Sequence, residues 1–389
     1  MPSSCQSPLR VLMTADTVGG VWTYAVDLCR ALEGRNVEVL LATMGAEVKP
    51  HQRNELAGLS HVRLAESRFA LEWMEAPWAD VQRAGRWLLE LEESFRPHAV
   101  HLNGYVHGSL PFGAPVLCAG HSCVRSWWKA VRGEPVPSSW DTYTDKVQLG
   151  LRSARLVVAP TRWMLDQLRA EYGALRATRV IPNARPWTQG GGPKARKEPY
   201  ILSVGRLWDD AKNARALARV AADLPWPVRL AGDPRSPDGA EVTLANVEHL
   251  GFLPPDAMAG QYAGAGIYAL PALYEPFGLS VLEAAQHACA LVLGDIPSLR
   301  EVWGDAAMYV PPRDSAGLEA ALRMLVCDAP LRQRYGRAAE DRARSFSLEA
   351  LARAYLDAYS DLITPFRSWP VPAGTAHRDK EAEPVSSLS

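Results

Sequence analysis

The stretch EPFGLSVLE, residues 275–283, predicts the end of a buried strand, a tight turn and the start of a helix. The run before it, residues 267–270, is apolar enough for a buried strand, and residues 280–287 are apolar at helical spacing. Pro276 and Gly278 would form the turn between them. A buried strand followed by a helix is the repeating unit of parallel α/β sheets.

The same alternation runs along most of the chain. The other runs predicted as strands are residues 10–13, 37–42, 99–102, 115–119, 156–159, 200–204, 228–231, 249–251 and 291–293. A chain of 389 residues exceeds the size of about 250 to 300 residues at which a single core stops growing. The pattern therefore predicts an α/β protein with two doubly wound domains, whose ligands bind beyond the carboxyl ends of the strands, in the cleft between the domains.

The predicted break between the domains is residues 184–199, which combine three glycines, three prolines and four basic residues without periodicity. We expect a first domain over residues 1–185 and a second over residues 186–346. Residues 369–389 are short of large apolar side chains and rich in charge, proline and serine, so this tail is predicted to be disordered.

The turn in residues 275–283 is suited to an anion. The backbone N–H groups of Gly278, Leu279 and Ser280 would point out of the helix start, where the helix dipole favours negative charge, and a diphosphate would fit there. Phosphate repels carboxylates, so Glu275 and Glu283 would accept hydrogen bonds from hydroxyl groups on either side of it, the sugar for Glu275 and the ribose for Glu283. The alternative is that Glu283 merely suits the helix dipole.

A second candidate anion site follows the strand at residues 200–204. Arg206 stands at the strand end, and Asp209 or Asp210 can cap a helix whose apolar face carries Ala214, Leu217, Ala221 and Leu224. Lys212 is predicted in the first turn of that helix. Cations are disfavoured there, so Lys212 and Arg206 suggest a compensating diphosphate. The alternative is a solvated surface pair.

The composition excludes several classes of protein. The 42 basic and 43 acidic residues give a net charge of -1, so the protein has no net positive charge to attract nucleic acid or an acidic membrane. The six cysteines are far apart and 48% of the residues are hydrophobic, so we expect reduced thiols and a cytoplasmic protein. The first residues offer too short an apolar run for a signal peptide, so none is expected, and no run reaches the ~18 apolar residues that span a bilayer. Peripheral contact with the inner face of a membrane stays open. Cys118 and Cys123 flank His121 without matching a zinc pattern, and no metal site is predicted.

Four motifs together resemble one family, the retaining GT-B glycosyltransferases of the family-four type. They are TVGGVWTYA (17–25), GRLWDDAKN (205–213), EPFGLSVLEA (275–284) and DIPSLREVWGDAA (295–307). The resemblance runs from about Leu9 to about Tyr359 and implies two Rossmann-like domains facing across a cleft, the first binding acceptor and the second donor. It also implies that the last helix, about residues 347–368, crosses back to the first domain.

The resemblance assigns roles to five residues. Arg206 and Lys212 match the family's diphosphate-binding pair, Glu275 the residue under the donor sugar, Glu283 the ribose ligand and His121 the histidine at the donor sugar. Two positions depart from the common pattern. Ser122 follows His121 where many relatives carry Asp, which changes the surroundings of the sugar, and Ala184 stands where a glycine is usual.

Further candidates lie around these motifs. Gly20 and Phe277 are expected on the donor side, and the candidates for the acceptor side are Gly19, His101, Asn103, Trp127 and Trp128. The Gly19-Gly20 pair lacks side chains that would keep a ligand from the backbone. A structural hydrogen bond is the alternative for His101 and Asn103, and packing is the alternative for the two tryptophans.

The resemblance implies transfer of a hexose from a nucleoside-diphosphate sugar, with UDP favoured, to a hydroxyl of a glycan, lipid or small molecule. No cofactor or metal is expected, and the departing phosphate oxygen takes the acceptor's proton. A sugar-nucleotide epimerase or a phosphorylase would need a base or a pyridoxal lysine that the sequence does not show. A silent sugar-nucleotide-binding protein would be expected to lack Arg206, Lys212 or Glu275, and all three are present.

Overall fold

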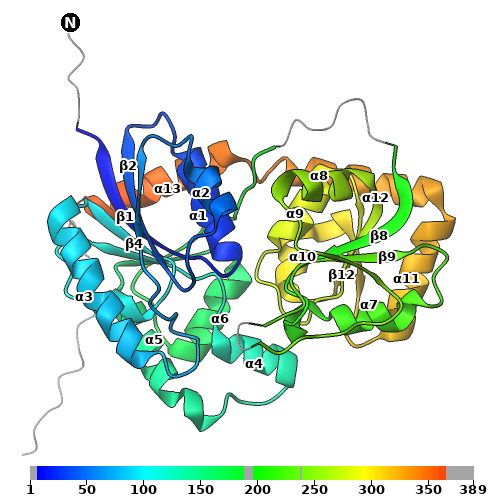
Figure 1. Cartoon of the computed structure of the whole chain (residues 1–389), viewed down its shortest axis with the longest axis horizontal. Coiled ribbons are helices and arrows are strands. Elements are labelled where there is room, and N and C mark those ends of the chain that lie inside the picture. Colours follow the sequence, from blue (N-terminus) through cyan, green and yellow to red (C-terminus); the bar gives the residue numbers. More distant parts are fainter. Residues whose placement is uncertain (1–6, 188–195, 237–238, 365–389) are drawn as a thin grey trace, which may run out of the picture.

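The computed structural model describes residues 7–187, 196–236 and 239–364. The predicted tail at residues 369–389 and the centre of the predicted connector lie outside these ranges. The described chain forms two lobes side by side, each a parallel sheet with helices on both faces (Figure 1). This confirms the predicted fold class.

The sheet of the first lobe has the strand order β3-β2-β1-β4-β5-β6-β7. Its strands are β1 (Leu9–Asp16), β2 (Val37–Met44), β3 (Val62–Glu66), β4 (Ala99–Leu102), β5 (Val116–Ala119), β6 (Leu156–Ala159) and β7 (Thr178–Val180). Its helices are α1 (Gly20–Ala31), α2 (Pro50–Leu56), α3 (Trp78–Phe95), α4 (Val124–Arg132), α5 (Asp141–Ser153) and α6 (Arg162–Tyr172), with the 3-10 turns η1 (Val106–Ser109) and η2 (Ser138–Trp140).

The sheet of the second lobe has the order β10-β9-β8-β11-β12-β13. Its strands are β8 (Glu198–Val204), β9 (Val228–Ala231), β10 (Glu248–Gly251), β11 (Ala265–Leu270), β12 (Ala290–Gly294) and β13 (Ala307–Val310). Its helical segments are η3 (Asp210–Lys212), α7 (Ala214–Ala221), α8 (Pro255–Gly264), α9 (Leu279–Gln286), α10 (Pro297–Trp303), η4 (Gly304–Ala306), α11 (Ser315–Cys327) and α12 (Ala329–Ala343), and the chain then continues into α13 (Leu348–Ile363).

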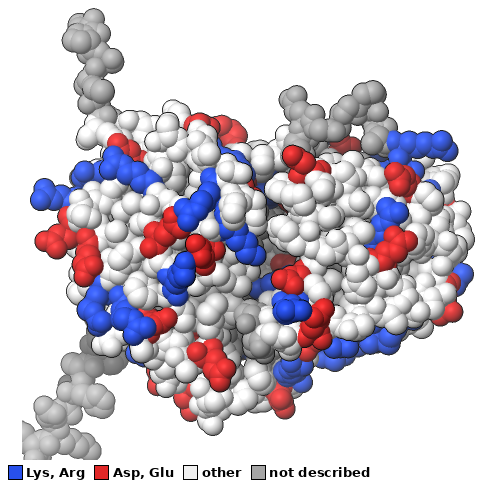
Figure 2. Space-filling model, viewed as in Figure 1, with Lys and Arg blue, Asp and Glu red and all other residues white. Residues whose placement is uncertain are grey.

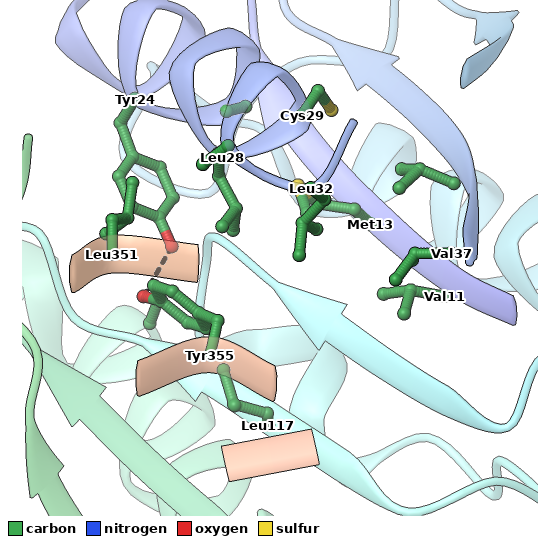
Figure 3. Close-up of a cluster of buried hydrophobic side chains, with 14 of the residues drawn as sticks. Val11, Met13, Tyr24, Leu28, Cys29, Leu32, Val37, Leu117, Leu351 and Tyr355 are labelled. Carbon is green, nitrogen blue, oxygen red and sulfur yellow. Dashed lines mark hydrogen bonds between the residues drawn. The ribbon is translucent and has the colours of Figure 1, made fainter. Parts of the chain in front are cut away.

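The side chains of successive strand residues pack in two different cores, one on each face of the sheet. In β1, Val11 and Met13 pack under α1, whereas Leu12 faces the opposite core. The helix α13 is the last in sequence, yet it lies in the first lobe and packs on α1 and β4 (Figure 1). Figure 3 shows Leu351 and Tyr355 of α13 in this core, with the hydroxyl of Tyr24 donating to that of Tyr355 at 2.5 Å.

Three strands of the structure, β3, β7 and β13, are not predicted from the sequence. Each is an edge strand of its sheet. An edge strand is covered less completely than a central one, so β3 and β7 can carry charged side chains, among them Arg63 and Arg179. The third strand, β13, is apolar but only four residues long. Every run predicted as a strand lies within a strand of the structure or overlaps one.

The single helix predicted after Asp209 is wrong. Asp209 does cap a helical turn, accepting from the Ala211 N–H at 3.0 Å, but this turn is η3, and Lys212 is its last residue. Asn213 then takes a left-handed conformation, φ 56°, before α7 begins. Its side chain donates to the carbonyls of Pro271 and Pro312, so long-range hydrogen bonds fix the residue that interrupts the helix.

Within the described residues, no helix is both long and apolar enough to cross a membrane.

Candidate active site

Several of the predicted site residues meet between the two lobes, where the surface is hollowed (Figure 2). The start of α1 in the first lobe faces the second lobe closely. A β-carbon placed on Gly19 would lie 3.5 Å from Nη1 of Arg206, and one on Gly20 would lie 3.8 Å from Leu279. The glycine pair and the two second-lobe motifs therefore lie together, although they are far apart in sequence.

Glu275 is fixed in the loop between β11 and α9 by contacts to both its side chain and its backbone. Its side chain is nearly buried, and Lys212 Nζ lies 2.5 Å from its Oε2. The Ser298 hydroxyl, from the DIPSLREVWGDAA motif, donates to the Glu275 carbonyl at 2.6 Å. The carboxylate thus has one orientation and one cation beside it.

The turn that follows Glu275 is held from the first lobe. The Pro276 carbonyl accepts a hydrogen bond from the Thr161 hydroxyl at 3.1 Å, and Gly278 has φ 88°, the left-handed conformation that favours glycine. The helix α9 then begins at Leu279 without a side-chain cap. Its first N–H groups have no acceptor within the helix, which is the arrangement that binds anions.

Arg206 lies beside this helix start. Its Nη2 is 2.7 Å from Asp209 Oδ2, and Asp209 also accepts from the indole N–H of Trp127 at 3.1 Å. Burial alone would raise the pKa of Asp209, but Arg206, Lys212 and the hydrogen bonds outweigh it and lower the pKa. Asp209 is therefore a fixed anion that orients Arg206.

Glu283 makes contacts that the sequence analysis did not predict. Its Oε1 lies 2.5 Å from Arg185 Nη2, and the Tyr262 hydroxyl donates to its Oε2 at 2.9 Å. Arg185 also binds Asp27 of α1, at 2.6 Å, and the Asp27 side chain is fully buried. One guanidinium thus joins α9 of the second lobe to α1 of the first.

Arg185 was placed in the connector because it stands among glycine, proline and basic residues. Asp27 is fully buried and needs a cation, but Arg30 lies 3.0 Å from it in the same helix, so no local signal in the sequence singled out Arg185.

His121 and Asn103 form a pair on the first-lobe side. His121 Nε2 is 2.8 Å from Asn103 Oδ1, and its ring meets Tyr24 edge-on at 4.4 Å. The Asn103 amide nitrogen donates to the Thr14 carbonyl at 2.6 Å, so its oxygen faces His121 and the histidine donates from Nε2. Burial lowers the pKa of His121 to about 4, so the ring is neutral near pH 7, with Nδ1 as an acceptor.

The expectation that His101 faces an acceptor is wrong. The residue has no exposed surface, its Nδ1 lies 2.7 Å from the Tyr359 hydroxyl and its ring stacks on Tyr355. Burial lowers its pKa to about 3. His101 belongs to the core beneath α13, so the structural alternative holds for it.

The tryptophans lie at the seam between the lobes. Trp127 packs in an apolar cluster with Val131, Ala211 and Tyr274, and its indole N–H donates a hydrogen bond to Asp209. Trp128 packs edge-on against Trp127. The packing alternative therefore accounts for the surroundings of Trp127.

Sequence reasoning also missed two carboxylates near the first-lobe strand ends. Asp16 accepts from the Val18 N–H at 2.8 Å, and burial raises its pKa against the opposing effect of Arg206. Glu72 accepts from the N–H groups of Tyr105 and Val106, and burial raises its pKa to about 7. Glu72 stands in a loop without periodicity, so no local signal marked it.

Among the described residues, no group of three or more His, Cys, Asp or Glu side chains is arranged to hold a metal ion.

Comparison with known families agrees with this geometry. Residues 18–185 match the model of Glycosyltransferase Family 4, and residues 198–328 match that of Glycosyl transferases group 1. The O-antigen chain mannosyltransferase B of Escherichia coli is 28% identical over 173 residues, which are 41% of this chain and 45% of that protein. The alpha-maltose-1-phosphate synthase of Mycolicibacterium smegmatis is 27% identical over 292 residues, 64% of this chain and 74% of that protein.

Solved structures share the fold at lower identity. The sucrose-phosphate synthase of Thermosynechococcus elongatus superposes with a TM-score of 0.77 at 19% identity, covering 91% of this chain and 98% of that one. The Anabaena protein HepE, in complex with UDP-glucose, gives 0.70 at 17% identity, covering 91% and 100%. From its two facing Rossmann-like lobes and the two family models that match them, this chain belongs to the GT-B glycosyltransferases of the Glycosyltransferase Family 4 and group 1 type.

Proposed function

We propose that this protein transfers a hexosyl group from UDP-sugar to an acceptor hydroxyl, with retention of configuration and without a metal. The observation that carries the proposal is the meeting of Arg206, the Lys212–Glu275 pair and the start of α9 opposite Gly19 and Gly20. Two cations and free helix N–H groups then surround the place where the diphosphate would lie.

Both cations keep donors for phosphate while they stay paired. An ammonium has three N–H bonds and a guanidinium has five, so one contact to Glu275 or to Asp209 leaves the others available. The carboxylates hold the cations in place before the donor binds. Such preorganised charge stabilises the negative charge that grows on the leaving diphosphate.

In the proposed reaction, the bond from the anomeric carbon to the phosphate oxygen breaks while a bond to the acceptor oxygen forms on the same face. The acceptor's proton goes to the departing phosphate oxygen. Glu275 lies under the sugar and stabilises positive charge at the anomeric carbon. The neutral His121 accepts a hydrogen bond from a sugar hydroxyl at Nδ1.

The choice of UDP is supported by HepE, a structural neighbour solved with UDP-glucose. Titrating the protein with UDP-, GDP- and ADP-sugars in a thermal-shift assay tests it, since a ligand at 100 times its Kd adds about 2.7 kcal/mol. We expect a UDP-sugar to give the largest shift. A larger shift with a GDP- or ADP-sugar would reject UDP, and no shift with any of them would reject the proposed function. The acceptor class, a cytoplasmic location and peripheral membrane contact stay predictions.

Turnover should survive excess EDTA. The physical reason is that Arg206 and Lys212 supply the positive charge that a divalent ion supplies in other transferases. The measurement is the initial rate with the best donor, before and after chelation. Loss of activity that manganese restores would contradict the prediction.

Replacing Arg185 by methionine should raise KM for the donor by roughly tenfold and leave kcat nearly unchanged, because Glu283 would lose a charge-assisted hydrogen bond that orients it. Steady-state kinetics with varied donor measure this. The control is Tyr262→Phe, which removes only the weaker neutral contact to Glu283 and should have a smaller effect. A lower melting temperature with an unchanged KM would mean that Arg185 only ties the lobes together.

A further inference from the structure

A separate cavity of about 310 Å³ lies where α4 of the first lobe meets η3 and α7 of the second. Its size falls at the lower end of the range for small-molecule pockets, about 300 to 1,000 Å³. The charged residues of its lining are Arg132, Arg215, Arg219, Arg313, Asp209 and Asp210. The described residues that line it do not include Arg206, Lys212, Glu275 or Glu283, so the cavity lies beside the proposed donor site and meets it at Asp209.

The lining carries more positive than negative charge. Asp210 is paired with Arg132 at 2.9 Å, and Asp209 is already bound to Arg206. In the part of the chain that the structure describes, the exposed side chains of Arg215 and Arg219 have neither a hydrogen-bond nor an ion-pair partner. They stand four residues apart, so they project from one face of α7. Figure 2 shows basic side chains gathered along the edge of the second lobe beside α7.

The start of α7 adds to this positive field. Asn213 precedes the helix, but its side chain donates to the Pro271 and Pro312 carbonyls at 2.9 and 2.7 Å and does not cap α7. The N–H groups of Ala214 and Arg215, in the first turn, belong to residues that line the cavity. Unpaired guanidinium groups, an uncapped helix start and a half-open cavity thus occur at one place.

The walls are tied together across the two lobes. Arg313 donates to the Val131 carbonyl at 3.0 Å, and Trp127 of α4 donates to Asp209 at 3.1 Å. The wall from the second lobe includes η3, which is capped by Asp209, the partner of Arg206, and ends at Lys212. A ligand in the cavity would therefore contact the same short turn that positions the proposed diphosphate ligands.

We propose that this cavity binds a phosphorylated small molecule of sugar-phosphate size, with Arg215 and Arg219 holding the phosphate. Guanidinium groups match phosphate in geometry, and a phosphate monoester carries about two negative charges, enough to balance the unpaired arginines. The volume equals that of about ten waters in the liquid, which leaves room for a hydroxylated body beside the phosphate. Asp210 offers carboxylate oxygens to its hydroxyls.

Binding can be tested without turnover. Ribose 5-phosphate is titrated into the full-length protein by calorimetry, with inorganic phosphate and ribose as comparisons. We expect ribose 5-phosphate to bind with a millimolar or lower Kd, more tightly than either comparison. In the Arg215→Ala/Arg219→Ala variant, binding should weaken about tenfold or more, since two charge-assisted hydrogen bonds are lost. The matched control is Arg334→Ala/Arg337→Ala, which removes two exposed charges from α12 of the same lobe and should change the Kd less than twofold.

Three results would overturn the proposal. If ribose 5-phosphate does not bind, or if both double variants weaken its binding equally, the arginines would form only a positively charged surface and no specific site. Loss of binding in Lys212→Ala, with the Arg215→Ala/Arg219→Ala variant unaffected, would place the ligand in the donor site. Phosphate binding as tightly as ribose 5-phosphate would mean that the cavity has no contacts for the sugar.

An activity measurement forms a second arm, which rests on the proposed function. A ligand that binds only the described arrangement of the lobes stabilises it. Saturating ribose 5-phosphate should then lower the donor KM of the wild type by about fivefold or more, which is the lower end of typical coupling between sites. The donor KM of the Arg215→Ala/Arg219→Ala variant should not change. If ribose 5-phosphate binds but the wild-type KM does not change, the coupling to the donor site is refuted and the binding site in the cavity is kept.

Discussion

Replacing Lys212 by alanine is expected to lower kcat by about 10²- to 10³-fold, the scale seen when one preorganised charge stabiliser is removed. The Lys212 ammonium lies 2.5 Å from Glu275, at the place proposed for the diphosphate. Without it, charge on the leaving group is less stabilised and Glu275 loses its only ion-pair partner within the described residues. Arg206→Ala should fall in the same range. The measurement is kcat at saturating donor.

An exposed lysine provides the control for this prediction. Lys129 lies on the surface of α4, and its replacement by alanine should leave kcat unchanged. If Lys212→Ala also stayed within about threefold of the wild type, the residue would be a surface cation without a role in catalysis. A Lys212→Ala/Glu275→Gln double variant separates the loss of the ion pair from the loss of phosphate contact, because the coupling energy of the two changes reports their direct interaction.

Glu275→Gln should depress kcat far more than it changes KM, with donor binding by calorimetry within about tenfold of the wild type. The substitution keeps the shape of a nearly buried side chain and removes the charge that is proposed to matter most as the anomeric carbon becomes positive. The neighbouring contact from Ser298 goes to the backbone carbonyl, so the loop should stay in place.

Glu283→Ala is the contrasting variant. A ribose ligand contributes equally to the ground state and the transition state, so this change should mainly raise the donor KM and leave kcat nearly unchanged. It also leaves Arg185 with Asp27 alone, so its thermal stability must be measured in parallel. If Glu275→Gln altered only KM and Glu283→Ala abolished kcat, the donor would lie the opposite way across the loop.

The sequence was informative wherever a feature is local. The central strands are continuous apolar runs because both of their faces are buried, and this pattern needs no knowledge of the partners. The Glu275 turn could be predicted for the same reason, since the end of β11, a glycine in the left-handed conformation and the start of α9 all lie within residues 270–279. Four motifs at fixed places in the chain were then enough to identify the family.

Local reasoning failed where a distant group decides the outcome. The helix predicted through Lys212 is interrupted because Asn213 is held by two carbonyls that lie 58 and 99 residues away. His101 has the polarity of a site residue, but α13 covers it, and its partner Tyr359 is 258 residues along the chain. Burial by a returning helix leaves no mark on the sequence around the buried residue.

By itself, then, the sequence determined two doubly wound domains and the turn between Glu275 and Glu283, since strand and helix periodicity and turn residues act over a few positions. Only the tertiary structure decided which charges meet. The Asp27–Arg185–Glu283 bridge spans 158 residues on one side, and the arginine-lined cavity takes its walls from both lobes. Such contacts depend on how complete elements pack, because a side chain's partners across an interface are fixed by the orientation of whole sheets and helices and not by its neighbours in sequence.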